Sequence, residues 1–188
     1  MGQPCVFIRL TGCNLRCRWC DTGYAYSVGR DMSIDAISDA VDQYRCRLVE
    51  LTGGEPLCQP QTPELAERLL ERGYCVLCET NGSQPIDRLP RGVVRIMDIK
   101  CPGSGESDKN RWANLDQLLP DDEVKFVIAD RTDFDWASDI VDRYAIASRV
   151  RATHFSAAGG TLPPLTLIRW ILEARPDIRY QPQLHRLL

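Results

Sequence analysis

Three cysteines within a short loop constrain this chain more than any other feature. Cys13, Cys17 and Cys20 are spaced Cys-x3-Cys-x2-Cys directly after a short apolar run. Structural zinc sites close with four protein ligands, and no fourth cysteine or histidine follows here within a turn or two. Three thiolates on a four-iron cluster would leave one iron open to a ligand that is not protein. The spacing therefore favours an iron–sulfur site with an open position, and zinc or plain structural thiols are the alternatives.

Composition limits the classes of protein to which the chain can belong. Its 188 residues suffice for a single domain with a sizeable core. A formal net charge of −3 argues against a broad nucleic-acid face, and no apolar run approaches the length of a membrane span. Nine cysteines without a secretory signal favour a reducing compartment in which thiols remain available for metal. We expect a cytoplasmic protein that binds neither nucleic acid nor membrane.

Apolar, β-prone runs alternate with amphipathic segments along the chain, which predicts an α/β fold. Such an alternation is typical of about six mainly parallel strands with helices outside, as a barrel or an open wound sheet. A Gly- and Ser-rich stretch at 102–111 is a candidate for a mobile loop or lid. The expected strands are 5–10, 48–51, 74–78, 93–99, 123–128 and 150–155, with a short one at 178–181, and the expected helices are 34–44, 62–70, 134–144 and a segment beginning at 163–164.

The motifs that suggest chemistry all follow predicted strands. In parallel α/β folds, ligands bind at the carboxyl ends of the strands. Each motif alone could be an ordinary turn, but five at the same edge predict one site. The five are the cysteine loop, Gly53-Gly54-Glu55, Glu79-Thr80-Asn81, Asp98 with Lys100, and Ser156 to Gly160.

The remaining cysteines are predicted to be structural. Cys75 and Cys78 have Cys-x-x-Cys spacing, but residues three apart on a strand point to opposite faces and should not chelate one ion. Small core or boundary positions are expected for Cys5, Cys46, Cys58 and Cys101.

The cysteine loop, with Trp19 before its third cysteine, resembles the signature of the radical S-adenosylmethionine (SAM) superfamily. The resemblance implies a modified partial (β/α) barrel with a 4Fe–4S cluster. It also implies that the amino and carboxylate groups of SAM chelate the open iron, and that electron transfer into the sulfonium releases a 5′-deoxyadenosyl radical. In such an enzyme the cofactor supplies the difficult chemistry, while the protein positions and shields it.

A longer series of motifs narrows the resemblance to the 7-carboxy-7-deazaguanine synthase family. The series is Arg9, Cys20-Asp21-Thr22, Thr52-Gly-Gly-Glu55, Glu79-Thr-Asn-Gly82, Asp98-Ile-Lys-Cys-Pro-Gly103 and Pro182-Gln-Leu-His185, and it spans nearly the whole chain. The resemblance implies a carbon–nitrogen lyase of queuosine precursor biosynthesis. It would contract 6-carboxy-5,6,7,8-tetrahydropterin to 7-carboxy-7-deazaguanine, release ammonia and regenerate SAM. A homodimer and a flavodoxin- or ferredoxin-type electron donor are implied as well.

The resemblance also assigns roles to individual residues. Cys13, Cys17 and Cys20 would bind the cluster. Thr22 would bind Mg²⁺ through its hydroxyl, although a threonine in this position often caps a helix instead. The pterin would be contacted by Arg9, Thr52 and His185. SAM would be lined by Trp19, Cys20, Asp21, Gly53, Gly54, Glu55, Glu79, Asp98, Ile99, Lys100, Ser156, Ala157, Ala158 and Gly159.

The ends of the chain depart from the family pattern. A Gln-Gly-Glu stretch that helps to bind the pterin usually precedes the first apolar strand, and here Met1 lies too close to Cys5 to leave room for it. We expect Met1 to lie downstream of the native start, and the C-terminus is a second candidate for truncation. Two other functions remain open at this stage. One is an activating protein for glycyl-radical enzymes, and the other is a non-catalytic module with zinc on the three loop cysteines.

Overall fold

The computed structural model describes residues 3–175 and 177–183. Within them the chain forms two compact units that are interleaved in sequence. Of the described residues, the first unit comprises 3–14, 21–80 and 84–95, and the second comprises 15–20, 81–83, 96–175 and 177–183.

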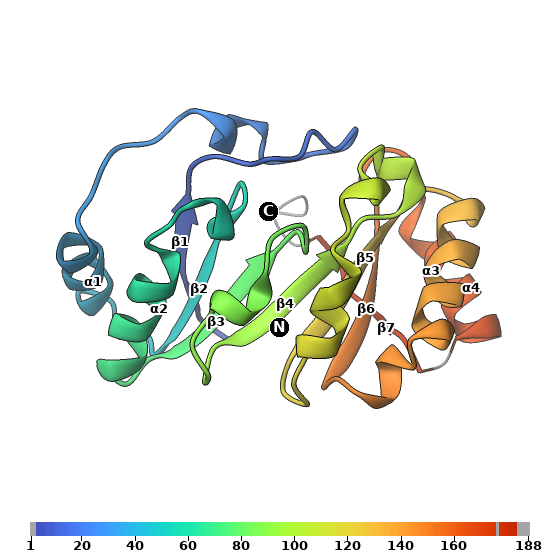
Figure 1. Ribbon diagram of the computed structural model, residues 1–188. Coiled ribbons are helices and arrows are strands. Elements are labelled where there is room, and N and C mark those ends of the chain that lie inside the picture. Colours follow the sequence, from blue (N-terminus) through green and yellow to red (C-terminus); the bar gives the residue numbers. More distant parts are fainter. Residues whose placement is uncertain (1–2, 176, 184–188) are drawn as a thin grey trace. The chain divides into compact units, whose positions relative to one another are not determined.

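The first unit is built on three parallel strands with two helices beside them (Figure 1). In chain order it contains β1 (Val6–Leu10), the 3-10 helix η1 (Gly23–Tyr26), α1 (Ile34–Asp42), β2 (Leu48–Gly53), η2 (Pro56–Cys58), α2 (Thr62–Glu71), β3 (Cys75–Thr80) and η3 (Ile86–Arg88). Its core combines residues of the strands with residues of α2, and all of them are almost completely buried: Val49, Leu51 and Val76 from β2 and β3, and Leu65 and Leu69 from α2.

Two local signals explain where the first unit's helices begin and end. The Ser33 hydroxyl accepts a hydrogen bond from the amide of Ala36 and so caps α1, as its sequence predicts. Gly73 follows α2 with a φ of +78°, a left-handed conformation that ends a helix at little cost only when no side chain is present.

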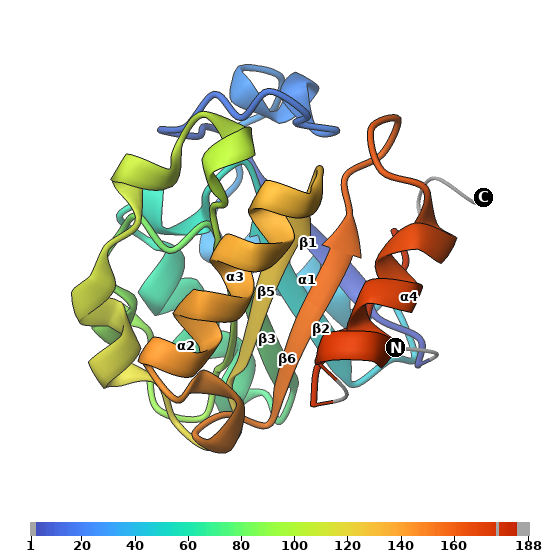
Figure 2. The same ribbon diagram turned by 90° about the vertical axis from the view of Figure 1, so that its right-hand side faces the viewer.

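The second unit continues the alternation of strands and helices (Figure 2). It contains β4 (Val94–Ile99, whose first two residues belong to the first unit), η4 (Pro102–Ser104), η5 (Ser107–Lys109), η6 (Trp112–Gln117), β5 (Glu123–Ile128), α3 (Arg131–Arg143), η7 (Ile146–Ser148), β6 (Ala152–Ala157), α4 (Pro164–Ala174) and β7 (Arg179–Tyr180). Strands β4 to β7 pair in parallel, each with the next along the chain. Three edge-to-face phenylalanines form the centre of its core: Phe126, Phe134 and Phe155.

The predicted α/β class and the parallel arrangement of the strands are confirmed, with corrections to the boundaries. The described residues contain seven strands, because the short strand expected at 178–181 is present as Arg179–Tyr180 and pairs with β6. Strands β2 and β3 extend further than predicted, so that Thr52 and Glu79 lie within strands rather than in the turns after them. Helix α3 begins three residues early because Asp130 caps it, its carboxylate accepting a hydrogen bond from the amide of Asp133.

The stretch 102–111, the candidate mobile loop or lid, contains short helical turns. It forms two short 3-10 turns, and the side chain of Asn110 holds the backbone of Lys100 at both ends. The Lys100 amide donates to Asn110 Oδ1 at 2.9 Å, and Asn110 Nδ2 donates to the Lys100 carbonyl at 2.9 Å. In the part of the chain that the structure describes, no helix is long and apolar enough to cross a membrane.

Candidate active site

In the first unit, the start of the cysteine loop is hydrogen-bonded to the Gly53-Gly54-Glu55 turn. The Gly54 amide donates to the carbonyl of Leu10 at 3.0 Å, and the Glu55 amide donates to the carbonyl of Gly12 at 2.7 Å. The turn after β2 is therefore an extension of the β1–β2 pairing. Two predicted motifs that are about 40 residues apart in the sequence meet at the carboxyl ends of neighbouring strands.

The two glycines of this turn are required by that close approach. A Cβ on Gly53, whose φ is +145°, would lie 2.0 Å from the carbonyl oxygen of Leu10. A Cβ on Gly54 would lie 2.2 Å from the carbonyl oxygen of Gly12 and 2.9 Å from the Cβ of Cys13. The protein's own backbone therefore requires glycine at both positions, because a Cβ at either one would collide with it.

Arg9 and Thr52, the predicted substrate residues of the first unit, are neighbours. Their Cα atoms are register partners on β1 and β2, and side chains of register partners in a parallel pair point to the same face. The Arg9 guanidinium is exposed, lies 5.9 Å from the ring centroid of Tyr24, and donates a long hydrogen bond of 3.5 Å to the carbonyl of Gly53. His185, the third predicted substrate residue, lies outside the described residues.

Thr22 occupies the position before η1 without capping it. Within the described part of the chain its side chain makes no capping hydrogen bond, and its hydroxyl donates instead to Asp21 Oδ1 at 3.1 Å. Capping, the structural alternative for Thr22, therefore does not account for the residue. The two adjacent oxygen-bearing side chains are chemically suited to a hard cation such as Mg²⁺.

Glu55 and Glu79 are placed differently, although both follow the pattern of the predicted site. The side chain of Glu55 is fully buried, and its Oε1 atom accepts hydrogen bonds from the Leu57 amide and the Thr80 hydroxyl. Glu79 is half-buried and, by strand alternation, lies on the face of β3 opposite to Thr80. Thr80 was not among the predicted site residues; its place in the Glu-Thr-Asn motif was the available signal.

In the second unit, the remainder of the cysteine loop packs on the 102–111 segment. The Arg18 amide donates to the carbonyl of Ser104 at 3.0 Å, and the Arg16 amide donates to a carboxylate oxygen of Glu106 at 2.6 Å. The Trp19 ring lies against Gly103, where an added Cβ would come within 2.9 Å of it. The segment that was expected to be a lid therefore supports residues 15–20.

Asp98 and Lys100 form an ion pair at the end of β4. Lys100 Nζ lies 2.9 Å from Asp98 Oδ2, and both side chains are largely buried. Among the described residues, Asp98 Oδ1 is a buried oxygen that lacks a hydrogen-bond partner. A buried acceptor without a donor is costly, so this atom is suited to receive a hydrogen bond from a bound polar molecule. Ile99, between the two, points into the core.

The end of β6 and the turn after it supply the last predicted group of the second unit, with Ser156 and Ala157 inside the strand rather than in the turn. Ser156 is buried, and its hydroxyl donates to the carbonyl of Gln181 on the segment after β7. Ala157 and Ala158 are also buried, and the Ala158 amide extends the β5–β6 pairing by donating to the carbonyl of Ile128. The side chains here are therefore engaged in packing, and Gly159 is the half-buried position of the group.

The three cysteines predicted to bind the cluster differ in exposure. Cys13 and Cys17 are half-buried and Cys20 is exposed, and all nine cysteines of the chain are thiols outside disulfides. Among the described residues no three Cys, His, Asp or Glu side chains are gathered as a preformed metal site. A site of this kind commonly assembles as the metal binds, because deprotonated thiolates repel one another without it.

The other cysteines lie where a structural role places them, with one exception. Cys75 is exposed and Cys78 buried, which confirms that they occupy opposite faces of β3. Burial, and then the charges of Glu55 and Glu79, raises the pKa of the Cys78 thiol well above its usual value. Cys101 is buried, and Cys5 and Cys46 are half-buried, whereas Cys58 is exposed rather than in the core.

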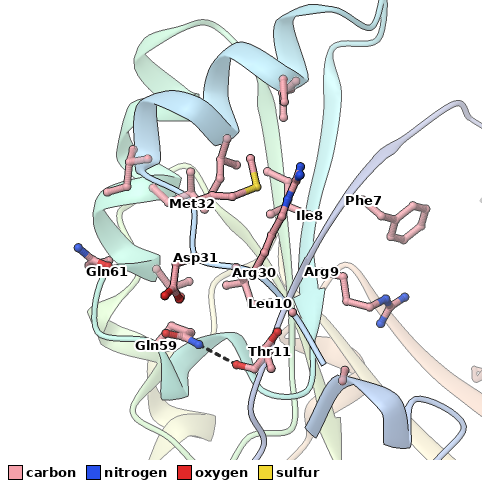
Figure 3. Close-up of a pocket in the computed structure, with 18 of the residues that line it drawn as sticks. Phe7, Ile8, Arg9, Leu10, Thr11, Arg30, Asp31, Met32, Gln59 and Gln61 are labelled. Atoms are coloured by element: carbon pink, nitrogen blue, oxygen red, sulfur yellow. Dashed lines mark hydrogen bonds between the residues drawn. The ribbon is translucent and has the colours of Figure 1, made fainter. Parts of the chain in front are cut away.

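A cavity of about 1020 Å³ in the first unit lies between β1 and α1 (Figure 3). Its walls combine apolar residues of β1 and α1 with the polar segment 27–32, and Gln59 Nε2 donates to the Thr11 carbonyl at its edge. The close-up shows Phe7 and Arg9 projecting from β1 on the side away from Asp31 and Met32. Of the predicted site residues in the described chain, only Arg9 lines this cavity.

Comparison with known proteins supports the resemblance that the motifs indicate. A sequence model of the Radical SAM superfamily matches residues 7–98. The chain is 43% identical to a 7-carboxy-7-deazaguanine synthase of Koribacter versatilis (strain Ellin345), over 100% of this chain and 89% of that protein. It is 40% identical to the protein of the same name from Chlorobaculum tepidum, over 100% of this chain and 86% of that protein.

A solved structure supports the fold. Streptococcus suis SuiB bound to S-adenosylmethionine superposes with a TM-score of 0.70 over 95% of this chain and 50% of that chain, at 14% sequence identity. At this level of identity the likeness concerns the fold alone.

Proposed function

The chain belongs to the 7-carboxy-7-deazaguanine synthase family within the radical SAM superfamily, and on that premise we propose that it converts 6-carboxy-5,6,7,8-tetrahydropterin to 7-carboxy-7-deazaguanine with release of ammonia. The observation that carries the proposal is the junction in the first unit where the Gly53–Glu55 turn is hydrogen-bonded to the start of the cysteine loop. That junction lies directly beyond Arg9 and Thr52, the register pair assigned to the substrate.

The residues present fit a 4Fe–4S cluster and SAM, the cofactors of the superfamily. Three thiols, none in a disulfide and one of them exposed, provide the soft donors that iron–sulfur clusters require. The unpartnered Asp98 Oδ1 offers an acceptor to a polar cofactor. When bound, the cluster and SAM supply the one-electron chemistry that abstracts hydrogen beside the substrate's carboxylate.

Within this proposal the protein's own side chains bind and orient. Cys13, Cys17 and Cys20 hold the cluster, and the backbone of Gly53 and Gly54 contacts the methionine part of SAM. The remaining SAM-lining residues keep the roles that the family resemblance implies. For Glu55 the burial of the carboxylate favours a role in holding the turn.

Arg9 and Thr22 orient the substrate in this proposal. The Arg9 guanidinium suits the pterin carboxylate because it presents a fixed fork of hydrogen-bond donors. Thr22 provides a hydroxyl oxygen for Mg²⁺, and the neighbouring Asp21 carboxylate strengthens the preference for that hard ion. A cation here would neutralise charge on the substrate and limit its orientations.

We further propose that residues 1–188 act as one radical SAM domain in a cytoplasmic homodimer. Reduction would come from a flavodoxin- or ferredoxin-type donor. The whole-chain similarity to named synthases supports this function over a glycyl-radical activating protein or a zinc module.

An anaerobic assay tests the proposal. Protein reconstituted with iron and sulfide, supplied with SAM, Mg²⁺, dithionite and the carboxytetrahydropterin, is expected to release 7-carboxy-7-deazaguanine and ammonia in equal amounts. Omission of Mg²⁺ should reduce the turnover rate of the wild type by a larger factor than that of the Thr22→Ala variant. A protein that holds the cluster and binds SAM but forms no product would contradict the substrate assignment, and one zinc without sulfide would contradict the cluster.

A further inference from the structure

Glu55 is a buried carboxylate held by donors from two different elements. The residue is 0% exposed, and its Oε1 atom accepts a hydrogen bond of 3.0 Å from the Leu57 amide and one of 2.8 Å from the Thr80 hydroxyl. The first bond is local, because the Glu55 side chain caps η2. The second joins the turn after β2 to the last residue of β3.

The geometry makes Thr80 a link between β3 and the cysteine loop. The Glu55 carboxylate accepts a hydrogen bond from the Thr80 hydroxyl, while the Glu55 amide donates to the carbonyl of Gly12 at 2.7 Å. Gly54, one residue earlier, lies so close to Gly12 that a Cβ at position 54 would collide with the Gly12 carbonyl. The position of the turn is thus determined on one side by β1 and on the other by the Thr80 hydroxyl.

Thr80 is 1% exposed, so water cannot replace its hydroxyl if the hydroxyl is removed. A buried carboxylate that loses one of its donors is destabilised and tends to move toward a new partner. Because Glu55 is continuous with Gly53 and Gly54, that movement would displace the backbone assigned to the methionine part of SAM. A small displacement at a binding turn is sufficient to weaken binding.

We propose that Thr80 is a positioning residue for SAM, acting through Glu55 on the Gly53–Gly54 turn. The inference rests on the proposed function, since it takes the turn to be the SAM site. The proposal predicts that loss of the Thr80 hydroxyl weakens only the contacts with the amino acid part of SAM. The pterin residues Arg9 and Thr52 are placed by the β1–β2 pairing, which does not include Thr80.

Thr80→Val tests the proposal, because valine keeps the β-branched shape and removes only the hydroxyl. Thr80→Ser keeps the hydroxyl and should restore the wild-type behaviour. Thr153→Val is the matched control: Thr153 is a strand threonine of 2% exposure whose hydroxyl, among the described residues, has no hydrogen-bond partner.

Binding is measured anaerobically by calorimetry on cluster-reconstituted protein, without substrate or reductant. Thr80→Val is expected to weaken SAM binding about tenfold, the effect of losing one charge-assisted hydrogen bond. Binding of 5′-methylthioadenosine, which lacks the amino acid part, should change less than twofold, as should the KM for the pterin. Thr153→Val should bind SAM as the wild type does.

The outcomes separate this inference from the proposed function. If Thr80→Val binds SAM as tightly as the wild type, or loses SAM and 5′-methylthioadenosine binding equally, the positioning role is wrong. If Thr80→Ser fails to restore binding, packing rather than the hydroxyl is responsible and the inference is again wrong. If instead the wild type binds SAM but never converts the pterin, the proposed function fails while the role of Thr80 stands.

Discussion

Arg9 on β1 and Thr52 on β2 are register partners at the carboxyl ends of two neighbouring parallel strands. Parallel pairing places their side chains on one face, so a charged donor and a hydroxyl are held side by side. Such a pair can bind a carboxylate and an adjacent polar atom of one small molecule. The pair also identifies which substitutions should affect the substrate without affecting the cofactor.

Arg9→Ala is expected to raise the KM for the carboxytetrahydropterin by 10- to 100-fold, since a hydrogen bond to a charged group contributes about 1.5–3 kcal/mol. Arg9→Lys should be intermediate, because an ammonium keeps the charge and loses the fork of donors. Steady-state kinetics under anaerobic conditions, with SAM affinity measured separately, would check this.

A surface arginine provides the control for Arg9. Arg143 forms an exposed pair with Asp139 on α3, at 2.6 Å, and Arg143→Ala should leave the KM unchanged because such pairs contribute little. If Arg9→Ala weakens SAM binding as much as pterin binding, the assignment of Arg9 to the substrate is contradicted.

The cysteines should differ in their reactivity with iodoacetamide. In protein freed of iron, Cys20 and Cys75 are both exposed and should be alkylated. Cys78 and Cys101 should resist, because burial raises the pKa of each thiol well above its usual value and keeps it neutral. After reconstitution Cys20 should be protected while Cys75 remains reactive, and mass spectrometry of peptides would show each site.

Serine substitutions provide the corresponding test of cluster binding. Cys13→Ser, Cys17→Ser and Cys20→Ser should each lose the iron and sulfide that the wild type retains, whereas Cys75→Ser should retain both. If reconstitution protects Cys20 and Cys75 from alkylation equally, Cys20 is not a cluster ligand. The same conclusion follows if Cys20→Ser retains as much iron as the wild type.

Gly54→Ala should be far more damaging than a glycine substitution elsewhere. Its Cβ would lie 2.2 Å from the Gly12 carbonyl oxygen, which is backbone and cannot move without separating β1 from β2. We expect a loss of about 3 kcal/mol or more in the free energy of unfolding and a lower cluster content. Chemical denaturation and iron analysis would measure both effects.

Gly73→Ala isolates the cost of backbone conformation from that of a steric clash. Gly73 has a φ of +78°, but no described atom lies within 4 Å of the Cβ that alanine would add. The expected cost is about 1–2 kcal/mol, with an unchanged cluster content. If Gly54→Ala and Gly73→Ala lose similar amounts of the free energy of unfolding, the close contact between Gly54 and Gly12 is not the reason that glycine is required at position 54.

The sequence predicted what depends on local chemistry. The predicted separation of Cys75 from Cys78 is confirmed, and the capping of α1 by Ser33 and the end of α2 at Gly73 likewise depend on neighbouring residues alone. The location of the motifs at strand ends follows from the α/β alternation, because parallel strands end at a common edge.

What sequence could not predict depends on contacts between distant residues. The 102–111 stretch has the composition of a mobile loop, but its order comes from Asn110 bonding to Lys100 and from residues 15–20 packing on it. The same limit applies to Thr80, whose hydroxyl acquires a role only when folding brings it to Glu55.

The pH dependence of stability has a testable contribution from Glu123 and His154 in the second unit. Glu123 Oε2 lies 2.9 Å from His154 Nε2, and the hydrogen bond from His154 lowers the pKa of Glu123 below its usual value of 4.5. The pKa of Glu123 is therefore lower in the folded than in the unfolded state. The pair stabilises the protein fully at pH values above the pKa of the unfolded state, and this stabilisation is lost as the pH falls through the pKa of the folded state.

Glu123→Gln should reduce the free energy of unfolding at pH 7 by about 1 kcal/mol and flatten its decline between pH 5 and the pKa of the folded state. Urea unfolding across this range would measure the difference, and parallel pH profiles for the two proteins would contradict the role of Glu123.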